Sequence, residues 1–466
     1  MPVRWLFALL LAGMVLAPVI AADASKRPNI VLILADDLGY GDLGCYGQSK
    51  IQTPHLDELA ADGIRFTQCY AGSTVCAPSR CALMTGLHTG HCRTRGNGGG
   101  GSPRSNVPLS KTDPCIAEVL KKAGYTTALI GKWGLGEEGS TGVPNLKGFD
   151  HFYGYLNQHH AHNYYPDFLW RNWKKEPLPN VQSDVEGVAE KRVAYVPDLC
   201  RDEALKFIEV NHERPFFLFF STTVPHANNE RTKVQKNGNE VPSDAPYTKQ
   251  PWPQPEKDKA AMITRMDADI GAILEKLKRY GLDEKTVVIF SSDNGPHREG
   301  GNDPAFFQSS GPFRGIKRSL TDGGIRVPGI VRWTGVTKPG TVSDHIWAFW
   351  DVLPTAAELA KATPPAGLDG ISFAPTILGK GDQLKHRYLY WEFHEGGFKQ
   401  AIRRDNWKAI RLGSGQPFEL YDVKSDPGET RNVAALHPDV VKNIEDDFAT
   451  ARTDSTAFPV LPAKRK

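Results

Sequence analysis

The segment Cys76-Ala-Pro-Ser-Arg80 combines a potential nucleophile with an arginine that could bind an anion. Pro78 could take the first position of a short helix that ends at Gly86, which would place Cys76 at the helix N-terminus. Free backbone N–H groups and the helix dipole favour an anion at such a terminus. One turn further along, Arg80 could hold that anion or orient the nucleophile. The alternative is that Cys76 forms a structural disulfide, the common role of a cysteine in an exported chain.

A second set of side chains supplies oxygen ligands. Asp36 and Asp37 follow one apolar run of the sequence, and Asp293 and Asn294 follow another. Three carboxylates and one carboxamide suit calcium or magnesium, whereas zinc would favour histidine or cysteine. Taken alone, each pair is equally explained by helix capping or by a turn. Their joint placement favours a metal site.

A third set could act on an anionic substrate. Lys132 and His226 follow two further apolar runs, and Lys317 precedes another. Lysines can contact anionic oxygens as charge develops, and a histidine can transfer a proton near neutral pH. His297 and Arg298, directly after the second acidic motif, are candidate substrate contacts, with the alternative that both are ordinary loop residues.

The elements that must position these groups are continuous apolar runs too short for most helices, which are typical of strands buried on both faces. Helix-like spacing occurs at 56–63, 115–123 and 260–280. The alternation predicts an α/β domain at 25–370, with a large doubly wound, mixed or parallel sheet flanked by helices. Ligands bind at the carboxyl edge of such sheets. The predicted strands are 29–35, 126–130, 215–221, 286–291 and 325–331.

After two consecutive prolines at 364–365, the sequence becomes rich in short aromatic segments. These segments, followed by a helical pattern at 439–452, predict a C-terminal α+β subdomain at 371–466 with an antiparallel sheet. Its predicted strands are 386–393, 399–403, 407–411 and 418–421.

Residues 1–24 read as a cleaved signal peptide, with a basic start, an apolar stretch and small residues at the end. We therefore expect a periplasmic or secreted protein without stable membrane association. A formal charge of +3, from 56 basic and 53 acidic residues, gives no reason to expect a nucleic-acid partner. If Cys76 is the nucleophile, the other six cysteines could pair in fifteen ways, with Cys81 expected to stay free. They are Cys45, Cys69, Cys81, Cys92, Cys115 and Cys200.

Cys-x-Pro-Ser-Arg with a downstream Thr-Gly resembles the signature of type I sulfatases, in the alkaline-phosphatase-like superfamily. Further motifs that resemble those of the family occur along the mature chain, in the same order as in the family. This resemblance implies that Cys76 is converted to Cα-formylglycine by a formylglycine-generating enzyme or an anaerobic maturase. Motifs at 34–42, 131–133, 225–226, 293–295, 314–328, 419–422 and 426–429 carry it.

The same resemblance implies a role for each candidate. Asp36, Asp37, Asp293 and Asn294 would bind calcium, or less readily magnesium, together with residue 76. Lys132 and Lys317 would contact the sulfate, Arg80 would orient the nucleophile, and His226 would protonate the leaving alcohol. The activity implied is hydrolysis of O-sulfate esters of sugars, with aryl sulfates as a further possible substrate.

One position departs from the family pattern. The usual motif is Gly-Lys-Trp-His-Leu-Gly, but this chain has Gly134 in place of the histidine. This glycine leaves three alternatives open: the enzyme releases sulfate more slowly, another histidine of the chain takes the place of the missing one, or the protein is a glycan-binding pseudoenzyme. His162, in a histidine-rich loop, is the candidate replacement, with packing of that loop as the alternative. A phosphonate or phosphate-ester hydrolase of the same superfamily is the other alternative for the activity.

Four aromatic residues in the loops, Tyr164, Tyr165, Trp170 and Trp173, could stack on a sugar or belong to the core.

Overall fold

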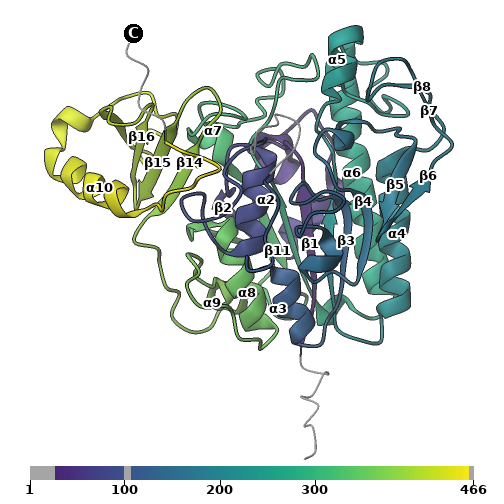
Figure 1. The fold of residues 1–466 in the computed structure, drawn as a ribbon, viewed down its shortest axis with the longest axis horizontal. Helices are drawn as coiled ribbons and strands as arrows, with labels where there is room; N and C mark the ends of the chain where they lie inside the picture. The colour runs from purple at the N-terminus through teal and green to yellow at the C-terminus, as the bar shows by residue number, and fades with distance from the viewer. Residues whose placement is uncertain (1–26, 99–106, 461–466) are drawn as a thin grey trace, which may run out of the picture.

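The computed structural model describes residues 27–98 and 107–460, so the predicted signal peptide at 1–24 lies outside the described residues. Its centre is an eleven-stranded sheet (Figure 1), in the order β12-β2-β11-β10-β1-β9-β3-β4-β5-β6, with β13 beside β2. The five predicted strands are all present: β1 Asn29–Ala35, β3 Thr126–Lys132, β9 Phe216–Ser221, β10 Thr286–Ser292 and β11 Arg326–Arg332.

The middle of the sheet is parallel and its sides are antiparallel. β1 pairs in parallel with both β10 and β9, and β3 pairs in parallel with β9 and β4. Antiparallel pairs join β10 to β11 and β11 to β2, so the predicted mixed sheet is confirmed. The other strands are β2 Ile64–Tyr70, β4 His151–Tyr155, β5 Phe168–Arg171, β6 Lys174–Pro177, β12 Thr341–Ser343 and β13 Trp347–Ala348, with a separate hairpin of β7 Val181–Gln182 and β8 Ala189–Lys191.

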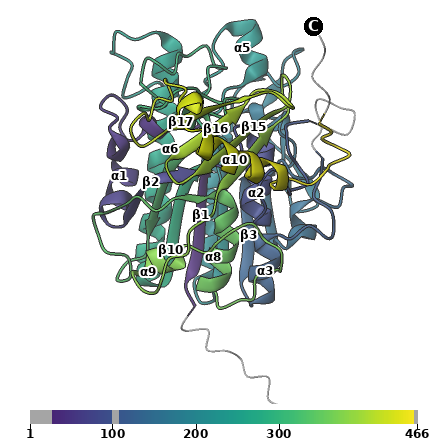
Figure 2. The same cartoon turned by 90° about the vertical axis from the view of Figure 1, so that its left-hand side faces the viewer.

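Helices cover both faces of the sheet, as Figures 1 and 2 show. Alternate residues of β1 enter two cores, Leu32 in one and Ile33 in the other, because successive side chains point to opposite faces. One core holds α2 Cys76–Thr85, α3 Ile116–Lys122, α8 Val352–Leu359 and α9 Ala374–Leu378; the other holds α1 Pro54–Ala61, α4 Val196–Asn211 and α6 Gln254–Arg279. Two short helices, α5 Asn229–Gln235 and α7 Asp322–Ile325, lie in loops.

The C-terminal part is a four-stranded antiparallel sheet with one helix, as predicted. The strands are β14 Leu389–Phe393, β15 Lys399–Arg404, β16 Trp407–Arg411 and β17 Phe418–Asp422, and the helix is α10 Pro438–Thr450. The buried Lys408 ammonium joins this sheet to the large domain through Asp322 at 2.6 Å. The predicted division at residue 371 precedes α9, a helix that packs in the large core.

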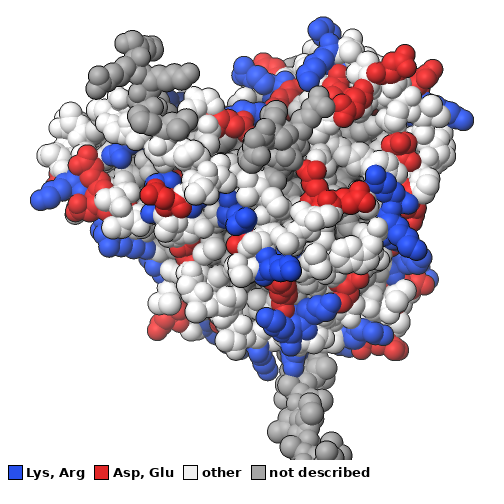
Figure 3. Space-filling view, viewed as in Figure 1, with Lys and Arg blue, Asp and Glu red and all other residues white. Residues whose placement is uncertain are grey.

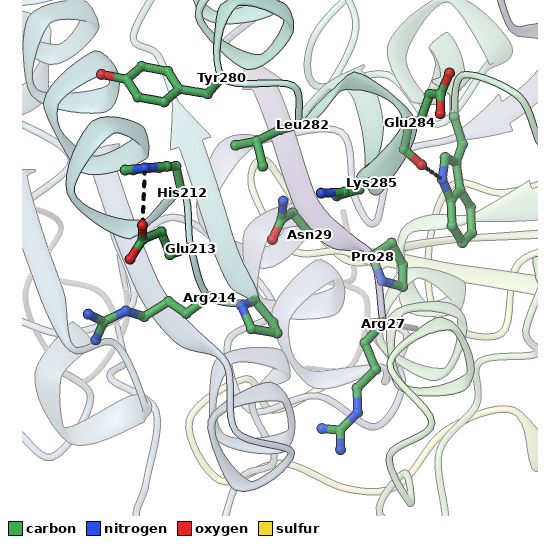
Figure 4. A pocket seen from close by; sticks show the side chains of 12 residues that line it. Arg27, Pro28, Asn29, His212, Glu213, Arg214, Tyr280, Leu282, Glu284 and Lys285 are labelled. Carbon is green, nitrogen blue, oxygen red and sulfur yellow. Dashed lines mark hydrogen bonds and ion pairs between the residues drawn. The ribbon is translucent and has the colours of Figure 1, made fainter. Parts of the chain in front are cut away.

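Two features of the surface help to locate the site. A pocket lies at the amino-terminal ends of β1, β9 and β10, lined by Arg27, Asn29, Pro215 and Lys285 among others (Figure 4). None of the predicted site residues is among the described residues that line it, because they lie at the opposite ends of these strands. Figure 3 shows acidic and basic side chains interspersed over one face of the molecule.

All seven cysteines fall in the described part of the chain, and each is a free thiol. The structural disulfide considered for Cys76 is therefore absent from these described residues, and so is any pairing of the other six. Cys81 is free, as expected, but the other cysteines share that state.

Candidate active site

Cys76 is the first residue of α2, which ends with Gly86 in the left-handed conformation at φ 72°. The helix begins two residues earlier than the sequence predicts, so Pro78 is its third residue. The Cys76 side chain is only 2% exposed, and its Sγ lies 3.3 Å from Oδ1 of Asp36. Burial, together with the nearby Asp293 and Asp36 carboxylates, raises the pKa of the Cys76 thiol well above its usual value. The unmodified thiol is thus protonated at neutral pH and is a weak nucleophile.

The four predicted metal ligands meet because β1 and β10 are neighbours in register. Ala35 pairs with Ser292, so Asp36 and Asp293 leave the sheet side by side. The Asp37 backbone N–H donates to Oδ1 of Asp293 at 3.1 Å. Asn294 donates from Nδ2 to Oδ1 of Asp37 at 2.6 Å. All four side chains are fully buried, as carboxyl-edge positions in a parallel sheet allow.

The electrostatics of this group favour a cation. Burial and the adjacent Asp36 raise the pKa of Asp293 to about 7. Asn294 Oδ1 is buried and has no hydrogen-bond partner in the ranges 27–98 and 107–460. A cation would relieve both the carboxylate repulsion and the unsatisfied carbonyl oxygen. The residues present therefore fit a hard divalent ion with oxygen ligands.

Three cationic side chains surround the carboxylates. Lys132 Nζ lies 2.6 Å from Asp36 Oδ2, and Lys317 Nζ lies 2.8 Å from Asp37 Oδ2. Although burial acts in the opposite direction, Lys132 and the other nearby cations hold the pKa of Asp36 well below its usual range. Arg80, one turn into α2, binds Asp293 and also donates from Nη1 to the Lys132 carbonyl oxygen at 3.0 Å.

His226 follows β9 and is 3% exposed. Its Nδ1 lies 2.7 Å from the Ala227 carbonyl oxygen, which places a proton on Nδ1. Its Nε2 then faces Lys317 Nζ at 3.1 Å and Asp37 Oδ2 at 3.5 Å. Burial and the Lys317 charge lower the pKa of His226 to about 3. The imidazole is therefore neutral in the absence of a bound anion or metal.

The three candidate substrate contacts differ in their placement. The ring of His162 stacks on His226, with centroids 4.9 Å apart and planes 14° apart. His297 is buried, and backbone groups engage both of its nitrogens, the Pro225 carbonyl at 2.9 Å and the Glu299 N–H at 3.0 Å. Arg298 is exposed. His162 thus differs from the other two in that its Nε2 has no hydrogen-bond partner among residues 27–98 and 107–460 and its ring lies against His226.

The space beside Gly134 is occupied by a glutamine and not by a histidine. Gly134 has φ +80°, and a Cβ added there would collide with the Gln158 carboxamide. Gln158 Nε2 is buried and unpaired within the described residues. A histidine side chain at position 134 would thus meet both backbone strain and an occupied space.

The aromatic side chains proposed to stack on a sugar are mostly structural. The Tyr164 hydroxyl is buried and donates to the His226 and Thr223 carbonyl oxygens, at 2.6 and 2.7 Å. Tyr165 and Trp170 are also in the core, and Trp173 is 60% exposed in the turn between β5 and β6. Tyr164 therefore positions the His226 backbone.

Two acidic residues in contact with the site were not predicted. Glu299 Oε2 lies 2.8 Å from Lys317 Nζ, and Glu299 also pairs with Arg318. Glu230 lies 2.9 Å from Nδ1 of His162. Glu299 lies in a loop and Glu230 in the first turn of α5, so neither is at the end of a strand. Only their spacing from known motifs, six residues after Asp293 and four after His226, could have drawn attention to them.

Comparison with known proteins identifies the family. A family model described as Sulfatase matches residues 28–362, and one described as N-sulphoglucosamine sulphohydrolase, C-terminal, matches residues 314–454. N-acetylgalactosamine-6-O-sulfatase from Bacteroides thetaiotaomicron is 30% identical, over 92% of this chain and 94% of that protein. Human arylsulfatase A is 31% identical, over 93% of this chain and 89% of that protein.

Solved structures agree. The crystal structure of Ps i-CgsB has a TM-score of 0.77 and 28% identity, covering 93% of this chain and 95% of that chain. Phosphonate monoester hydrolase of Agrobacterium radiobacter, at 22% identity and a TM-score of 0.64, covers 91% of this chain and 95% of its own and shares the fold. With the Cys76 helix, the buried acidic cluster and the flanking lysines in place, these matches establish that the chain belongs to the sulfatase family.

Proposed function

We propose that this protein is an exported sulfatase that hydrolyses O-sulfate esters of carbohydrates, with Cys76 converted to formylglycine and a divalent cation in the acidic cluster. One observation carries the proposal. Cys76 Sγ and Lys132 Nζ contact the two oxygens of the same Asp36 carboxylate, at 3.3 and 2.6 Å. The proposed nucleophile and a proposed sulfate-binding group therefore meet at one buried carboxylate, which is itself a proposed metal ligand.

Asp36, Asp37, Asp293 and Asn294 would hold the cation together with residue 76. A fully buried, all-oxygen set suits calcium better than magnesium, which retains several waters. When bound, the cation would supply Lewis-acid stabilisation of a sulfate oxygen and lower the pKa of the nucleophile. As formylglycine, residue 76 would supply a hydrate hydroxyl as that nucleophile.

The remaining roles belong to side chains in contact with this group. Lys132 and Lys317 would exchange a carboxylate partner for sulfate oxygens and stabilise charge that develops in the transition state. Arg80 would orient residue 76 from within the same helix. His226 is neutral with its Nε2 facing the site, so it would take up the proton released by the attacking hydroxyl of residue 76 and pass it to the leaving alcohol. His297 would hold the Pro225 backbone next to His226, and Arg298 would contact the outer part of the substrate.

Carbohydrate sulfates are favoured as substrates by two relatives. One is named for N-acetylgalactosamine 6-O-sulfate, and Ps i-CgsB was solved in a complex with a neocarrahexaose. The polar, histidine-containing loop at 157–167 would face a sugar hydroxyl more readily than an aryl ring. Aryl sulfates would then be secondary substrates.

Export and maturation complete the proposal. The basic, apolar and small-residue pattern at 1–24 supports secretion or a periplasmic location. Within residues 27–98 and 107–460, the longest apolar helices fall short of what a bilayer span requires. The expected partner during biosynthesis is a formylglycine-generating enzyme or an anaerobic maturase.

The test is production with a maturase, followed by a substrate screen. The panel contains N-acetylgalactosamine 6-sulfate, sulfated carrageenan oligosaccharides, 4-nitrophenyl sulfate and 4-nitrophenyl phosphate. We expect sulfate release from a sugar, loss of at least about a thousandfold in Cys76→Ala, and a Cys76 peptide lighter by the difference between a thiol and an aldehyde. Faster phosphate than sulfate release would instead indicate a phosphate-ester hydrolase. A glycan that binds without turnover, with an unmodified Cys76, would indicate a pseudoenzyme.

A further inference from the structure

Glu230, at the start of α5, connects two histidines of the loop that precedes β5. Its Oε2 lies 2.9 Å from Nδ1 of His162, and its Oε1 lies 3.2 Å from Nε2 of His159. The Glu230 side chain is 12% exposed. A carboxylate held by two imidazoles has little freedom to rotate, so the position of His162 is fixed by this contact.

This contact also fixes which nitrogen of His162 carries the proton. Although burial acts in the opposite direction, hydrogen bonds from His159 and His162 hold the pKa of Glu230 well below its usual value. The ionised carboxylate can only accept, so Nδ1 of His162 donates. Burial lowers the pKa of His162 although Glu230 opposes this shift, so the ring is neutral. Nε2 therefore keeps its lone pair, and it has no hydrogen-bond partner in the described parts of the chain.

His162 lies beside His226, the residue next to which the proposed mechanism places the leaving alcohol. Its ring stacks on His226, the residue proposed to protonate that alcohol, at 4.9 Å between centroids. His226 Nε2 in turn lies 3.1 Å from Lys317 Nζ, so the stacked His162 ring is one side chain away from a proposed sulfate-binding group. A neutral acceptor in this position requires a donor from the leaving group. A sugar provides hydroxyl donors there and an aryl ring does not.

We infer that His162, oriented by Glu230, binds the leaving sugar by accepting a hydrogen bond from one of its hydroxyl groups at Nε2. The inference rests on the proposed sulfatase function and deepens it, since it selects polyhydroxylated over aromatic leaving groups. His162 is the residue in contact with substrate, and Glu230 is a positioning residue that acts through the tautomer of His162. Without this hydrogen bond, the enzyme would distinguish less well between sugar sulfates, which have a hydroxyl donor, and substrates that lack one.

Three variants separate these roles. His162→Phe keeps an aromatic ring over His226 and removes the acceptor. Glu230→Gln keeps the shape of the side chain, but its amide can donate to Nδ1 and so place the proton of His162 on Nε2. His160→Phe is the matched control, because His160 lies in the same loop but packs its ring against Tyr155 and Phe168, at 5.0 and 4.5 Å between centroids, whereas Glu230 pairs with its neighbours His159 and His162.

The measurement is kcat/KM for the preferred sugar sulfate of the panel and for 4-nitrophenyl sulfate. We expect His162→Phe and Glu230→Gln to lower the sugar value by about 10- to 100-fold, and the aryl value by less than about threefold. His160→Phe should change the sugar value by less than about fivefold. Equal losses on both substrates, or no loss on the sugar, would overturn the inference.

A binding measurement separates this inference from the proposed function. In a Cys76→Ala background, calorimetry with each sugar sulfate of the panel reports affinity without turnover. Addition of His162→Phe should weaken sugar binding by about tenfold or more and leave 4-nitrophenyl sulfate binding unchanged. Failure of wild-type turnover would contradict the proposed function alone, whereas unchanged sugar affinity would overturn the role of His162.

Discussion

The guanidinium of Arg80 contacts the Asp293 carboxylate through two nitrogens, Nε at 3.0 Å and Nη2 at 2.8 Å. Both side chains are at most 1% exposed. Because Arg80 is one turn after Cys76 in α2 and Asp293 follows β10, this pair ties the helix of the proposed nucleophile to the edge of the sheet where we propose the metal site. Its planar geometry explains why an arginine serves here and a lysine would not.

Arg80→Lys should therefore destabilise the protein although it keeps the charge. The ammonium cannot span Asp293 and the Lys132 carbonyl oxygen together, so buried groups lose their partners. We expect a loss of about 2–4 kcal/mol in the free energy of unfolding, measured by urea denaturation in chelator. The exposed Arg298→Lys is the control and should stay within about 0.5 kcal/mol of the wild type. A loss in Arg80→Lys no larger than in this control would contradict the prediction.

Calcium should bind the acidic cluster and stabilise the folded state. At a hundredfold excess over the dissociation constant, the gain in unfolding free energy would be about 2.7 kcal/mol. Asn294→Ala removes the unsatisfied Oδ1 and should reduce the thermal shift caused by calcium. Asp369→Asn, in the separate cluster with His88 and His91, should leave that shift intact. Stabilisation by zinc but not by calcium or magnesium would argue against this ligand set.

Any side chain at position 134 should lower the free energy of unfolding, and a histidine there should not raise turnover. Gly134 and Gly139 both have φ +80°, but only Gly134 faces Gln158, whereas Gly139 has open space. Gly139→Ala should thus report backbone strain alone, about 1 kcal/mol, and Gly134→Ala should cost clearly more. Combining Gly134→Ala with Gln158→Ala should recover part of the difference. Equal costs for the two alanine variants would show that Gln158 does not fill this space.

Stability should fall as the pH drops below neutral, in part through His88. Burial lowers the pKa of His88 to about 4, against an ordinary value of 6.5, although Asp369 opposes the shift. The unfolded chain then binds this proton first, so the contribution is complete above pH 6.5 and is lost between pH 6.5 and 4. The slope is up to about 1.4 kcal/mol per pH unit. In urea denaturation, His88→Gln should make the unfolding free energy depend less steeply on pH between 6.5 and 4. The same substitution at the more exposed His212 should leave the slope unchanged. Identical slopes for the two variants would show that His88 does not contribute to the pH dependence.

The main sheet could be predicted because its central strands are apolar on both faces. The same reasoning located Asp36, Lys132, His226 and Asp293, since parallel strands release their last residues at one edge. β2 was missed because the half-buried sequence Ile64–Tyr70 carries polar side chains, and no buried apolar run marks it. The sequence pattern also does not reveal that β11 pairs antiparallel with both neighbours.

The positions of Glu230 and Gln158 could not be predicted, because each depends on the path of an irregular loop. Glu230 is held near the site by contacts such as Asn228 Nδ2 to Glu240 Oε2 at 2.8 Å. Hydrogen bonds between loop residues that are distant in the sequence leave no periodic pattern in it. Gln158 is beside Gly134 because β4 lies next to β3, and the short β4 was itself not predicted.

The burial of Cys76 has a consequence for the order of events during biosynthesis. With 2% of the residue exposed, and with Asp36 against its Sγ, the folded domain offers no access for a modifying enzyme. The conversion of Cys76 that we propose would therefore have to occur while the chain is still unfolded. Modification and folding would then compete in time, and a molecule that folded first would be trapped as a stable, unmodified product. The yield of active protein would be set by a ratio of two rates and not by stability.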